Sequence, residues 1–193
     1  MKKVTLITAV AVSAFLLSFK ILEPATWTID KAHAKLGFAI SHLMVSEVEG
    51  SFKITSATVS STKDDFTDAV VELTADAATV NTENEQRDTH LKSADFFDVA
   101  KFPTITFKST SFTKVADKKY KVKGNLTLHG VTKPVELEAI ANTGVNPMSK
   151  KTIAGFKVTG KIKRADFGIA PSMASAMLGE EVSIIANAEF SKN

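Results

Sequence analysis

Charged and imidazole side chains share one face of a predicted helix with apolar residues. Four residues stand at positions i, i+3, i+4 and i+7, on the same side of a helix: Arg87, His90, Leu91 and Ala94. If Leu91 and Ala94 face the core, Arg87 and His90 face it too. A buried guanidinium needs a partner, because burying an unpaired charge is costly. For Arg87 that partner is Asp88, another nearby carboxylate, or an anionic ligand.

Two further positions place a polar side chain at the end of an apolar strand face. Arg164 follows Ile162 by two residues and His42 follows Ile40 by two residues, so each continues the face of the strand before it. Arginine and histidine side chains at strand ends could ring the mouth of a barrel, where they would bind a phosphate, a carboxylate or a quinone oxygen.

A structural interpretation of the arginines stays open. Arg87 with Asp88, and Arg164 with Asp166, could form ion pairs that hold the helix over the end of a barrel. In that case neither arginine would contact a ligand.

The histidines do not indicate a metal site. They lie at positions 33, 42, 90 and 129, without the H-x-H or H-E-x-x-H spacing of metal ligands. We expect no metal and no cofactor. His33 and His42 are candidates either for ligand contact or for a structural role, and His129, beside Gly130, is expected in a turn.

Catalytic chemistry has little support in the sequence. The chain has no cysteine, which excludes thiol catalysis, disulfides and iron–sulfur clusters. It also has no G-x-S-x-G elbow, P-loop or G-x-G-x-x-G. One enzymatic alternative is a lipid hydrolase or isomerase that uses His90 as a base oriented by Asp88. Residues two positions apart on a helix, such as Asp88 and His90, do not face each other, so we expect no enzyme.

Charge gives no indication of a nucleic-acid partner. The chain has 24 Lys and Arg and 21 Asp and Glu, of which residues 1–25 hold three lysines and one glutamate. Residues 26–193 therefore carry 21 basic and 20 acidic residues, close to balance. One tryptophan and one tyrosine also offer little surface for stacking on bases.

From Trp27 onward the dominant signal is alternation of apolar and polar residues with a period of two, typical of half-buried strands. The alternating runs are 36–42, 71–77, 105–107, 120–128, 135–141, 156–162 and 182–190. About eight strands, each with one apolar face, indicate an antiparallel barrel or sandwich. Small residues at inward positions favour a barrel with a lumen: Ala75, Ala77, Gly124, Ala139, Ala141, Gly160, Ala186 and Ala188.

One segment interrupts the strand pattern. The capping box at 82–85, with Thr82 as N-cap and Glu85 at N3, predicts a helix that ends near Ser93. A short helical turn is predicted at residues 95–103, and a second short helix at residues 174–178. No linker or internal repeat is evident, so residues 26–193 are expected to form one domain.

Residues 1–25 are expected to be a signal peptide or an N-terminal anchor. Lys2 and Lys3 precede an uncharged apolar run at 4–19, the two parts that begin a secretory signal. The run is shorter than the ~20 residues of a typical membrane-spanning helix. No A-x-A tripeptide follows the run, so cleavage and retention as an anchor both stay open.

Several stretches of the chain resemble the YceI-like family of bacterial exported, polyisoprenoid-binding proteins. The most specific stretch is 87–98 (RDTHLKSADFFD), followed by 101–109 (KFPTITFKS), 124–135 (GNLTLHGVTKPV) and 164–168 (RADFG). Shorter matches lie at 30–33, 36–38, 42 and 48–52. The resemblance covers essentially all of residues 27–190, in order. One departure is Ala34, where the family commonly has serine.

The resemblance implies an all-β fold: an antiparallel, eight-stranded, lipocalin-like barrel with a short helix covering one end. Members of the family hold an isoprenoid or another long-chain amphiphile, with the tail in an apolar tunnel and the head near the mouth. The family also implies a periplasmic or otherwise extracytoplasmic location, no catalytic activity, and a homodimer.

We therefore expect an exported protein that binds a long-chain isoprenoid, a quinone-like molecule or a similar amphiphilic lipid for transport, storage or sensing. The alternative is a structural or stress-related envelope protein with a filled barrel. Membrane contact is expected only transiently or through an uncleaved N-terminus. Candidate head-group contacts are Arg87, His90, Arg164, His42, Asp88, Asp166 and His33. Candidate tunnel walls are Phe38, Ile40, Phe97, Phe107, Leu126, Phe156, Val158 and Phe167.

Overall fold

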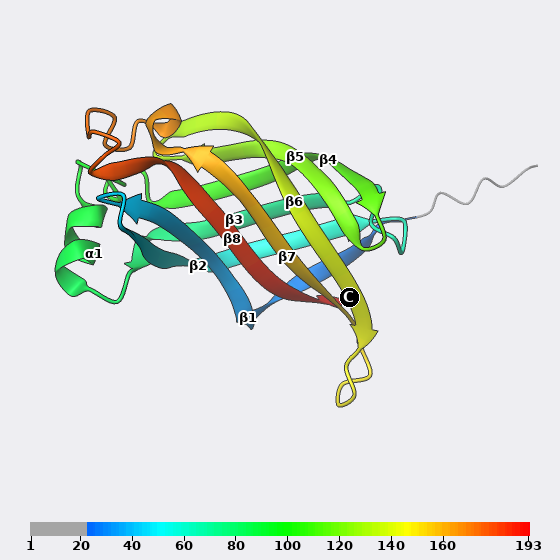
Figure 1. Cartoon of the computed structure of the whole chain (residues 1–193). Helices are drawn as coiled ribbons and strands as arrows, with labels where there is room; N and C mark the ends of the chain where they lie inside the picture. The colour runs from blue at the N-terminus through cyan, green and yellow to red at the C-terminus, as the bar shows by residue number, and fades with distance from the viewer. Residues whose placement is uncertain (1–22) are drawn as a thin grey trace, which may run out of the picture.

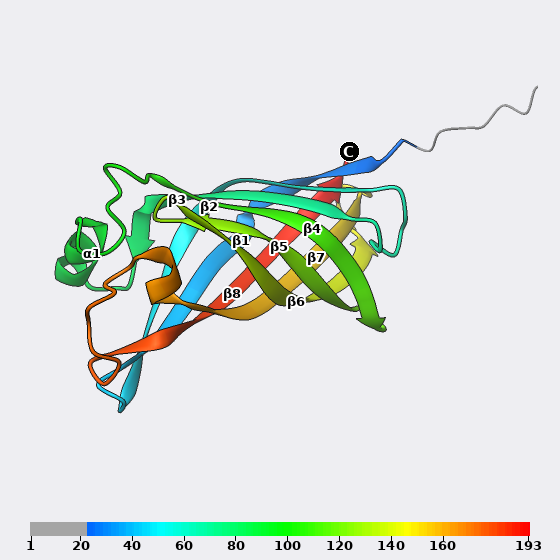
Figure 2. The same ribbon diagram turned by 90° about the horizontal axis from the view of Figure 1, so that it is seen from above.

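The computed structural model describes residues 23–193, which form a closed barrel of eight antiparallel strands (Figures 1 and 2). The expected signal peptide or anchor lies outside the described residues, except for its last three positions. Each strand pairs with the next along the chain, and the ladder between β1 and β8 closes the barrel, as predicted. The strands are β1 (Ala25–His42), β2 (Ser46–Ser61), β3 (Val70–Asn81), β4 (Thr104–Ala116), β5 (Lys119–Leu128), β6 (Val131–Val145), β7 (Thr152–Lys163) and β8 (Leu178–Lys192).

The strand β2 shows no continuous period-two alternation in the sequence, because a β-bulge shifts which of its residues face inward. Phe52 and Ile54 are buried, and the register with β3 shifts directly after Ile54. Beyond the shift the buried positions continue at Ala57 and Val59, three residues later instead of two. One extra residue in a strand inverts which positions face the core, so strict period-two matching overlooks such a strand.

The helix α1 (Glu85–Lys92) lies across one end of the barrel, as predicted (Figure 1). Its N-cap is Asn84, not Thr82, because the Asn84 side chain accepts a hydrogen bond from the Arg87 backbone N–H at 2.9 Å. The Thr82 backbone N–H instead donates to the Asp88 carboxylate at 2.9 Å. The helix ends at its C-cap Ser93, as the sequence predicts.

A short 3-10 helix, η1 (Arg164–Phe167), directly follows β7, where strand alternation predicts only the end of a strand. The second short helix predicted at 174–178 does not form, and these residues make a turn that leads into β8. Leu178 already pairs with His42 of β1, so the sheet takes up the backbone that a helix would need. Within residues 23–193, no helix is long and apolar enough to cross a bilayer.

Aromatic side chains fill the barrel at the end opposite α1, called here the plugged end. The rings of Trp27 and Phe66 lie 5.4 Å apart, and those of Phe66 and Phe156 lie 5.1 Å apart. Phe66 comes from the β2–β3 loop and is 2% exposed. The Tyr120 hydroxyl donates to the backbone carbonyl of Asp65 at 2.8 Å, which ties the same loop to β5. The loop therefore closes this end.

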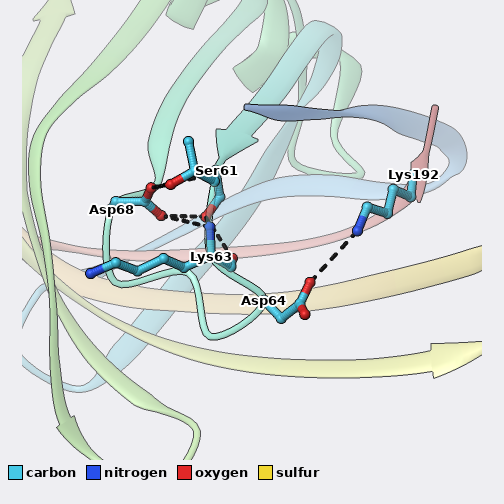
Figure 3. A network of polar contacts seen from close by, with 6 residues as sticks. Ser61, Lys63, Asp64, Asp68 and Lys192 are labelled. Atoms are coloured by element: carbon cyan, nitrogen blue, oxygen red, sulfur yellow. Dashed lines mark hydrogen bonds and ion pairs between the residues drawn. The ribbon is translucent and has the colours of Figure 1, made fainter. Parts of the chain in front are cut away.

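One carboxylate organises the β2–β3 loop (Figure 3). Asp68 accepts hydrogen bonds from the Ser61 hydroxyl at 2.5 Å, from the backbone N–H groups of Thr62 at 2.9 Å and Lys63 at 3.3 Å, and from the Thr62 hydroxyl. Burial alone would raise the pKa of Asp68, but these hydrogen bonds to the ionised form outweigh it and hold the pKa well below its usual value.

We expect Asp68→Asn to lower the free energy of unfolding at neutral pH by about 1–3 kcal/mol, because it weakens this network. Since folding lowers the pKa of Asp68, the carboxylate stabilises the fold above its unfolded-state pKa of about 4. That contribution is lost as the pH falls further, toward the folded-state pKa. Denaturant unfolding should therefore show a difference between wild type and variant that shrinks below about pH 4.

The matched control is Asp64→Asn in the same loop, whose side chain is fully exposed and lies 3.6 Å from the Lys192 ammonium group (Figure 3). Exposed pairs of this kind contribute roughly 0–1 kcal/mol. Equal destabilisation by the two substitutions would contradict the organising role of Asp68.

Candidate ligand-binding cavity

A cavity of about 450 Å³ occupies the lumen between the plugged end and α1. Phe112 and Phe190 line it on the side of the plugged end, and Arg87 lines it on the side of α1. Leu43 and Met177 also line it and are half or more exposed to solvent, so the cavity opens at the α1 end. Its volume falls within the roughly 300–1,000 Å³ typical of small-molecule sites.

Seven of the predicted tunnel walls line this cavity: Phe38, Ile40, Phe97, Phe107, Leu126, Phe156 and Val158. The eighth, Phe167, does not line it and is 1% exposed in the core beside Ile169 and Ala170. Phe167 belongs to η1, after β7 has ended at Lys163. Strand alternation therefore no longer determines the direction of its side chain.

The small inward residues shape the lumen in different ways. A Cβ at Gly124 would collide with the Phe107 ring, and one at Gly160 would collide with the Leu137 side chain, so these glycines make room for large neighbours. Two of the alanines line the cavity: Ala186 and Ala188. The other four are buried in the core: Ala75, Ala77, Ala139 and Ala141. Small residues thus predict the lumen correctly but only partly create it.

Four polar side chains line the cavity, and every other lining side chain in the described part of the chain is apolar. The four are His42, Arg87, His90 and Arg164, all of which the sequence predicts as candidates. They come from the end of β1, from α1 and from η1, at the end of the barrel that α1 covers (Figure 1). Polarity is therefore confined to one end of an otherwise apolar lumen.

Arg164 is 3% exposed, and its donors are already used by the protein. The five N–H groups of its guanidinium match five backbone carbonyl acceptors: Gly179 at 2.9 Å, Ile169 at 3.3 Å, Ala170, Met173 at 2.6 Å and Leu178 at 3.1 Å. The ion pair with Asp166 that the sequence left open does not form, because the guanidinium donates to these carbonyls and Asp166 is exposed. Arg164 therefore holds the segment 168–179 in place.

Arg87 has donors to spare. Its Nε–H donates to the Thr82 hydroxyl and one Nη2–H donates to the Thr82 carbonyl, both at 2.8 Å. The predicted ion pair with Asp88 does not form, because Asp88 accepts from the Thr82 hydroxyl at 2.6 Å and from its backbone N–H at 2.9 Å. Of the five N–H groups on the guanidinium, three have no partner within residues 23–193. Arg87 is thus the lining residue best placed to donate to a ligand.

His90 and His42 are exposed side chains at the open end. The His90 Nε2 atom lies 3.6 Å from the Asp95 carboxylate, and its ring packs edge-on against Phe96 at 4.9 Å. Asp88 is engaged by other groups, so the enzymatic pairing of His90 with Asp88 is not formed. Both histidines are in position to contact a polar group in the mouth of the cavity.

His33 lies outside the cavity, on the outer surface of the barrel. His33 lies where the register of β1 with β8 shifts, between Asp30 and Ala34, and its side chain is exposed. His33 donates a hydrogen bond from Nδ1 to the Asp30 carboxylate at 2.8 Å, and this bond, with the negative charges of Asp30 and Glu189, raises the pKa of His33. All three side chains are exposed, and exposed groups of this kind do not by themselves make a metal site.

Sequence patterns overlook the residues at the open rim of the cavity. Leu43, Met173 and Met177 line this end, and all three lie in turns, where no periodicity assigns a face. The only signal in the sequence is that these turns are apolar where turns are usually polar.

The known family described as the YceI-like domain matches residues 27–190, which span the barrel from β1 to β8. This chain belongs to the YceI-like family. The UPF0312 protein SA2479 of Staphylococcus aureus (strain N315) is 40% identical to it over 170 residues, which cover 86% of this chain and 96% of that protein. The resemblance seen in the sequence motifs is confirmed.

Solved structures share this YceI-like barrel. The YceI protein of Campylobacter jejuni is 34% identical, with a TM-score of 0.72 over 79% of this chain and 90% of that chain. A polyisoprenoid binding domain from Saccharophagus degradans has a TM-score of 0.63 at 15% identity, over 86% of this chain and 98% of that chain. The second similarity shows a common fold.

Proposed function

We propose that this YceI-like protein is an exported binding protein that holds a long-chain isoprenoid or similar amphiphilic lipid in its lumen. The observation that carries the proposal is the distribution of polarity around the cavity, with four polar side chains at one end and apolar side chains along the rest. An amphiphilic lipid has the same distribution. Each methylene removed from water contributes roughly 0.8 kcal/mol, so burial of the tail supplies affinity and the polar end sets the orientation.

The comparison with known proteins supports an isoprenoid tail in particular. The Saccharophagus degradans domain of the same fold is described as polyisoprenoid binding, and we extend that ligand class to this chain. The open lumen favours a binding protein over a filled, purely structural barrel. We propose binding rather than catalysis, since Asp88 does not orient His90, and we propose no metal or cofactor.

The proposed location is the periplasm or another extracytoplasmic space. Lys2, Lys3 and the apolar run at 4–19 support export through the N-terminus. A carrier of lipid between membranes would work in such a compartment. The homodimer implied by the family remains a prediction.

The test of this function is lipid uptake by the delipidated barrel. The protein is equilibrated in turn with a prenyl alcohol, a quinone and a fatty acid of similar chain length, and bound lipid is counted by mass spectrometry. Saturation at one lipid per barrel is the expected result for at least the prenyl chain. Failure to take up any of the three chains would overturn the proposal.

We expect Arg87→Gln to weaken binding of a prenyl phosphate about tenfold, because a charge-assisted hydrogen bond to the head group is lost. Binding of a prenyl hydrocarbon of the same length should change by less than about twofold, since the tail contacts stay intact. The two ligands are compared by equilibrium titration. Lys92→Gln is the control, because Lys92 lies on the same helix and does not line the cavity.

An equal loss of affinity for both ligands in Arg87→Gln would contradict a head-group role. It would show instead that Arg87 supports the shape of the mouth through its bonds to Thr82.

A further inference from the structure

Four large apolar side chains stand in solvent around the mouth of the cavity. Leu43 is 50% exposed, Met44 75%, Val45 84% and Met177 55%. The first three form the tip of the β1–β2 hairpin, and Met177 lies in the segment that precedes β8. The two segments are joined by a hydrogen bond at 3.1 Å from the Leu43 backbone N–H to the Met177 carbonyl. These four residues are called here the rim patch.

The hairpin tip holds this apolar surface in an unfavourable backbone conformation. Leu43 and Met44 both have positive φ, at 53° and 58°. They are the central residues of a β-turn closed by a hydrogen bond from the Val45 N–H to the His42 carbonyl. A β-turn with positive φ at both central positions normally takes Asn-Gly or Asp-Gly, because bulky residues are strained there. Neither the strain nor the exposure of these side chains benefits the isolated fold, so a contact outside the barrel is the simpler explanation of both.

The rim patch is continuous with the lumen. Leu43 and Met177 are exposed to solvent and also line the cavity, and Met173 lines it from the same segment as Met177. A long apolar chain that leaves the lumen therefore passes directly over the rim patch. Whatever covers the patch must receive that chain without exposing it to water.

Charge distribution identifies what can cover the rim patch. Residues 41–46 and 167–179, which form the hairpin tip and the facing segment, contain no Asp, Glu, Lys or Arg, although 23% of the chain is charged. The charged residues nearest to the rim patch in sequence are acidic, at Glu47, Glu180 and Glu181, whereas the cationic Arg87 lines the mouth from α1. An uncharged surface enters an apolar phase without desolvating ions, and flanking carboxylates do not attract anionic head groups.

We propose that the rim patch inserts into the surface of a lipid bilayer with little net charge, so that the bound lipid moves between lumen and bilayer without crossing water. This inference rests on the proposed lipid-binding function. A bilayer fits better than a protein partner because segments 41–46 and 167–179 offer no charged side chain to pair with a partner, while a bilayer takes up apolar side chains and the lipid tail alike, at roughly 0.8 kcal/mol per methylene kept from water.

The test compares vesicle binding by the barrel of residues 25–193 and by two variants. These residues contain every strand and both core clusters, and they leave out the apolar run at 4–19, which would bind vesicles by itself. The rim variant is Met44→Ser with Val45→Ser. The control variant is Val145→Ser with Met148→Ser, which removes apolar side chains of similar exposure (63% and 89%) in the β6–β7 hairpin.

In flotation assays with phosphatidylcholine vesicles, the rim variant should bind at least about tenfold more weakly than the intact barrel, since two apolar side chains no longer insert. The control variant should bind as the intact barrel does. Adding phosphatidylglycerol should not strengthen binding. Transfer of a prenyl lipid from vesicles should slow in the rim variant, while its affinity for the same lipid in detergent stays within about twofold.

Three results would overturn the inference: no vesicle binding by the intact barrel, equal loss in both variants, or binding that depends on anionic lipid. The detergent titration separates this failure from failure of the lipid-binding function. If the intact barrel binds lipid in detergent but does not bind vesicles, only the inference of membrane docking is wrong. The rim patch would then be expected to bind a protein partner. If it takes up no lipid in detergent, the proposed function itself falls.

Discussion

Replacing Ala186 by tryptophan is expected to reduce the affinity for a long-chain lipid by about fifty-fold while the barrel stays folded. Ala186 lies on β8, pairs with Leu36 and Val158, and lines the cavity from the middle of the wall. An indole at this position would fill part of the cavity in which we propose that the lipid tail binds. Loss of about three buried methylenes at roughly 0.8 kcal/mol each corresponds to about 2.4 kcal/mol, or about fifty-fold in affinity.

The neighbouring residue provides a matched control. Ile185 points outward from the same strand and is 42% exposed, so Ile185→Trp adds the same indole outside the lumen. Titration with a prenyl alcohol should give an affinity close to that of wild type for Ile185→Trp. Denaturant unfolding checks that Ala186→Trp remains folded. A folded Ala186→Trp protein that binds the lipid as tightly as wild type would show that the tail does not occupy the lumen.

Replacing Arg164 by alanine is expected to destabilise the fold by about 3 kcal/mol or more. The substitution leaves five backbone carbonyls without their donor in a site where the arginine is 3% exposed, and each unpaired buried group costs roughly 1–3 kcal/mol where water cannot replace the bond. Arg164→Lys should recover only part of the loss, since an ammonium group offers three donors without the planar fork. Unfolding in denaturant measures both.

Asp166→Asn is the control for the predicted ion pair. Asp166 is exposed and makes no ion pair with Arg164 among the described residues, so its substitution should change stability by less than about 0.5 kcal/mol. The opposite pattern would assign Arg164 to the ligand: an alanine variant as stable as wild type that has lost affinity only for lipids with anionic heads.

Much of the barrel follows from the sequence because seven strands show period-two alternation. β2 is the exception, since the bulge after Ile54 moves its buried positions to Ala57 and Val59. The same kind of irregularity lies in β1, between Asp30 and Ala34, beside His33, which does not line the cavity. Strand periodicity describes a side chain's direction only as long as the register is unbroken.

The sequence predicts which polar residues line the cavity, but it does not predict what each of them does. Arg87 and Arg164 look alike in the sequence, each near an acidic residue two or fewer positions away. Their partners turn out to be backbone carbonyls and one threonine, which the fold brings together from segments that no spacing rule connects. Only the three-dimensional arrangement distinguishes an arginine with every donor used from one with donors to spare.

The boundaries of helices are the least predictable feature. Thr82 and Asn84 are both good N-cap residues, and the choice depends on Asp88, which binds Thr82 and leaves Asn84 to cap α1. In the segment before β8, strand pairing determines where the turn ends. Residues 174–178 have helix-forming composition, but β8 begins at Leu178 and ends the turn there.

The most direct test of a lipid-binding lumen is mass spectrometry of the exported protein, first intact under native conditions and then after organic extraction. We expect a mass increase equal to one long-chain amphiphilic lipid per barrel, and we expect Ala186→Trp to lack it. An exported wild-type protein that carries no lipid, and that takes up no prenyl, quinone or acyl chain afterwards, would contradict the central claim that the cavity is a lipid site.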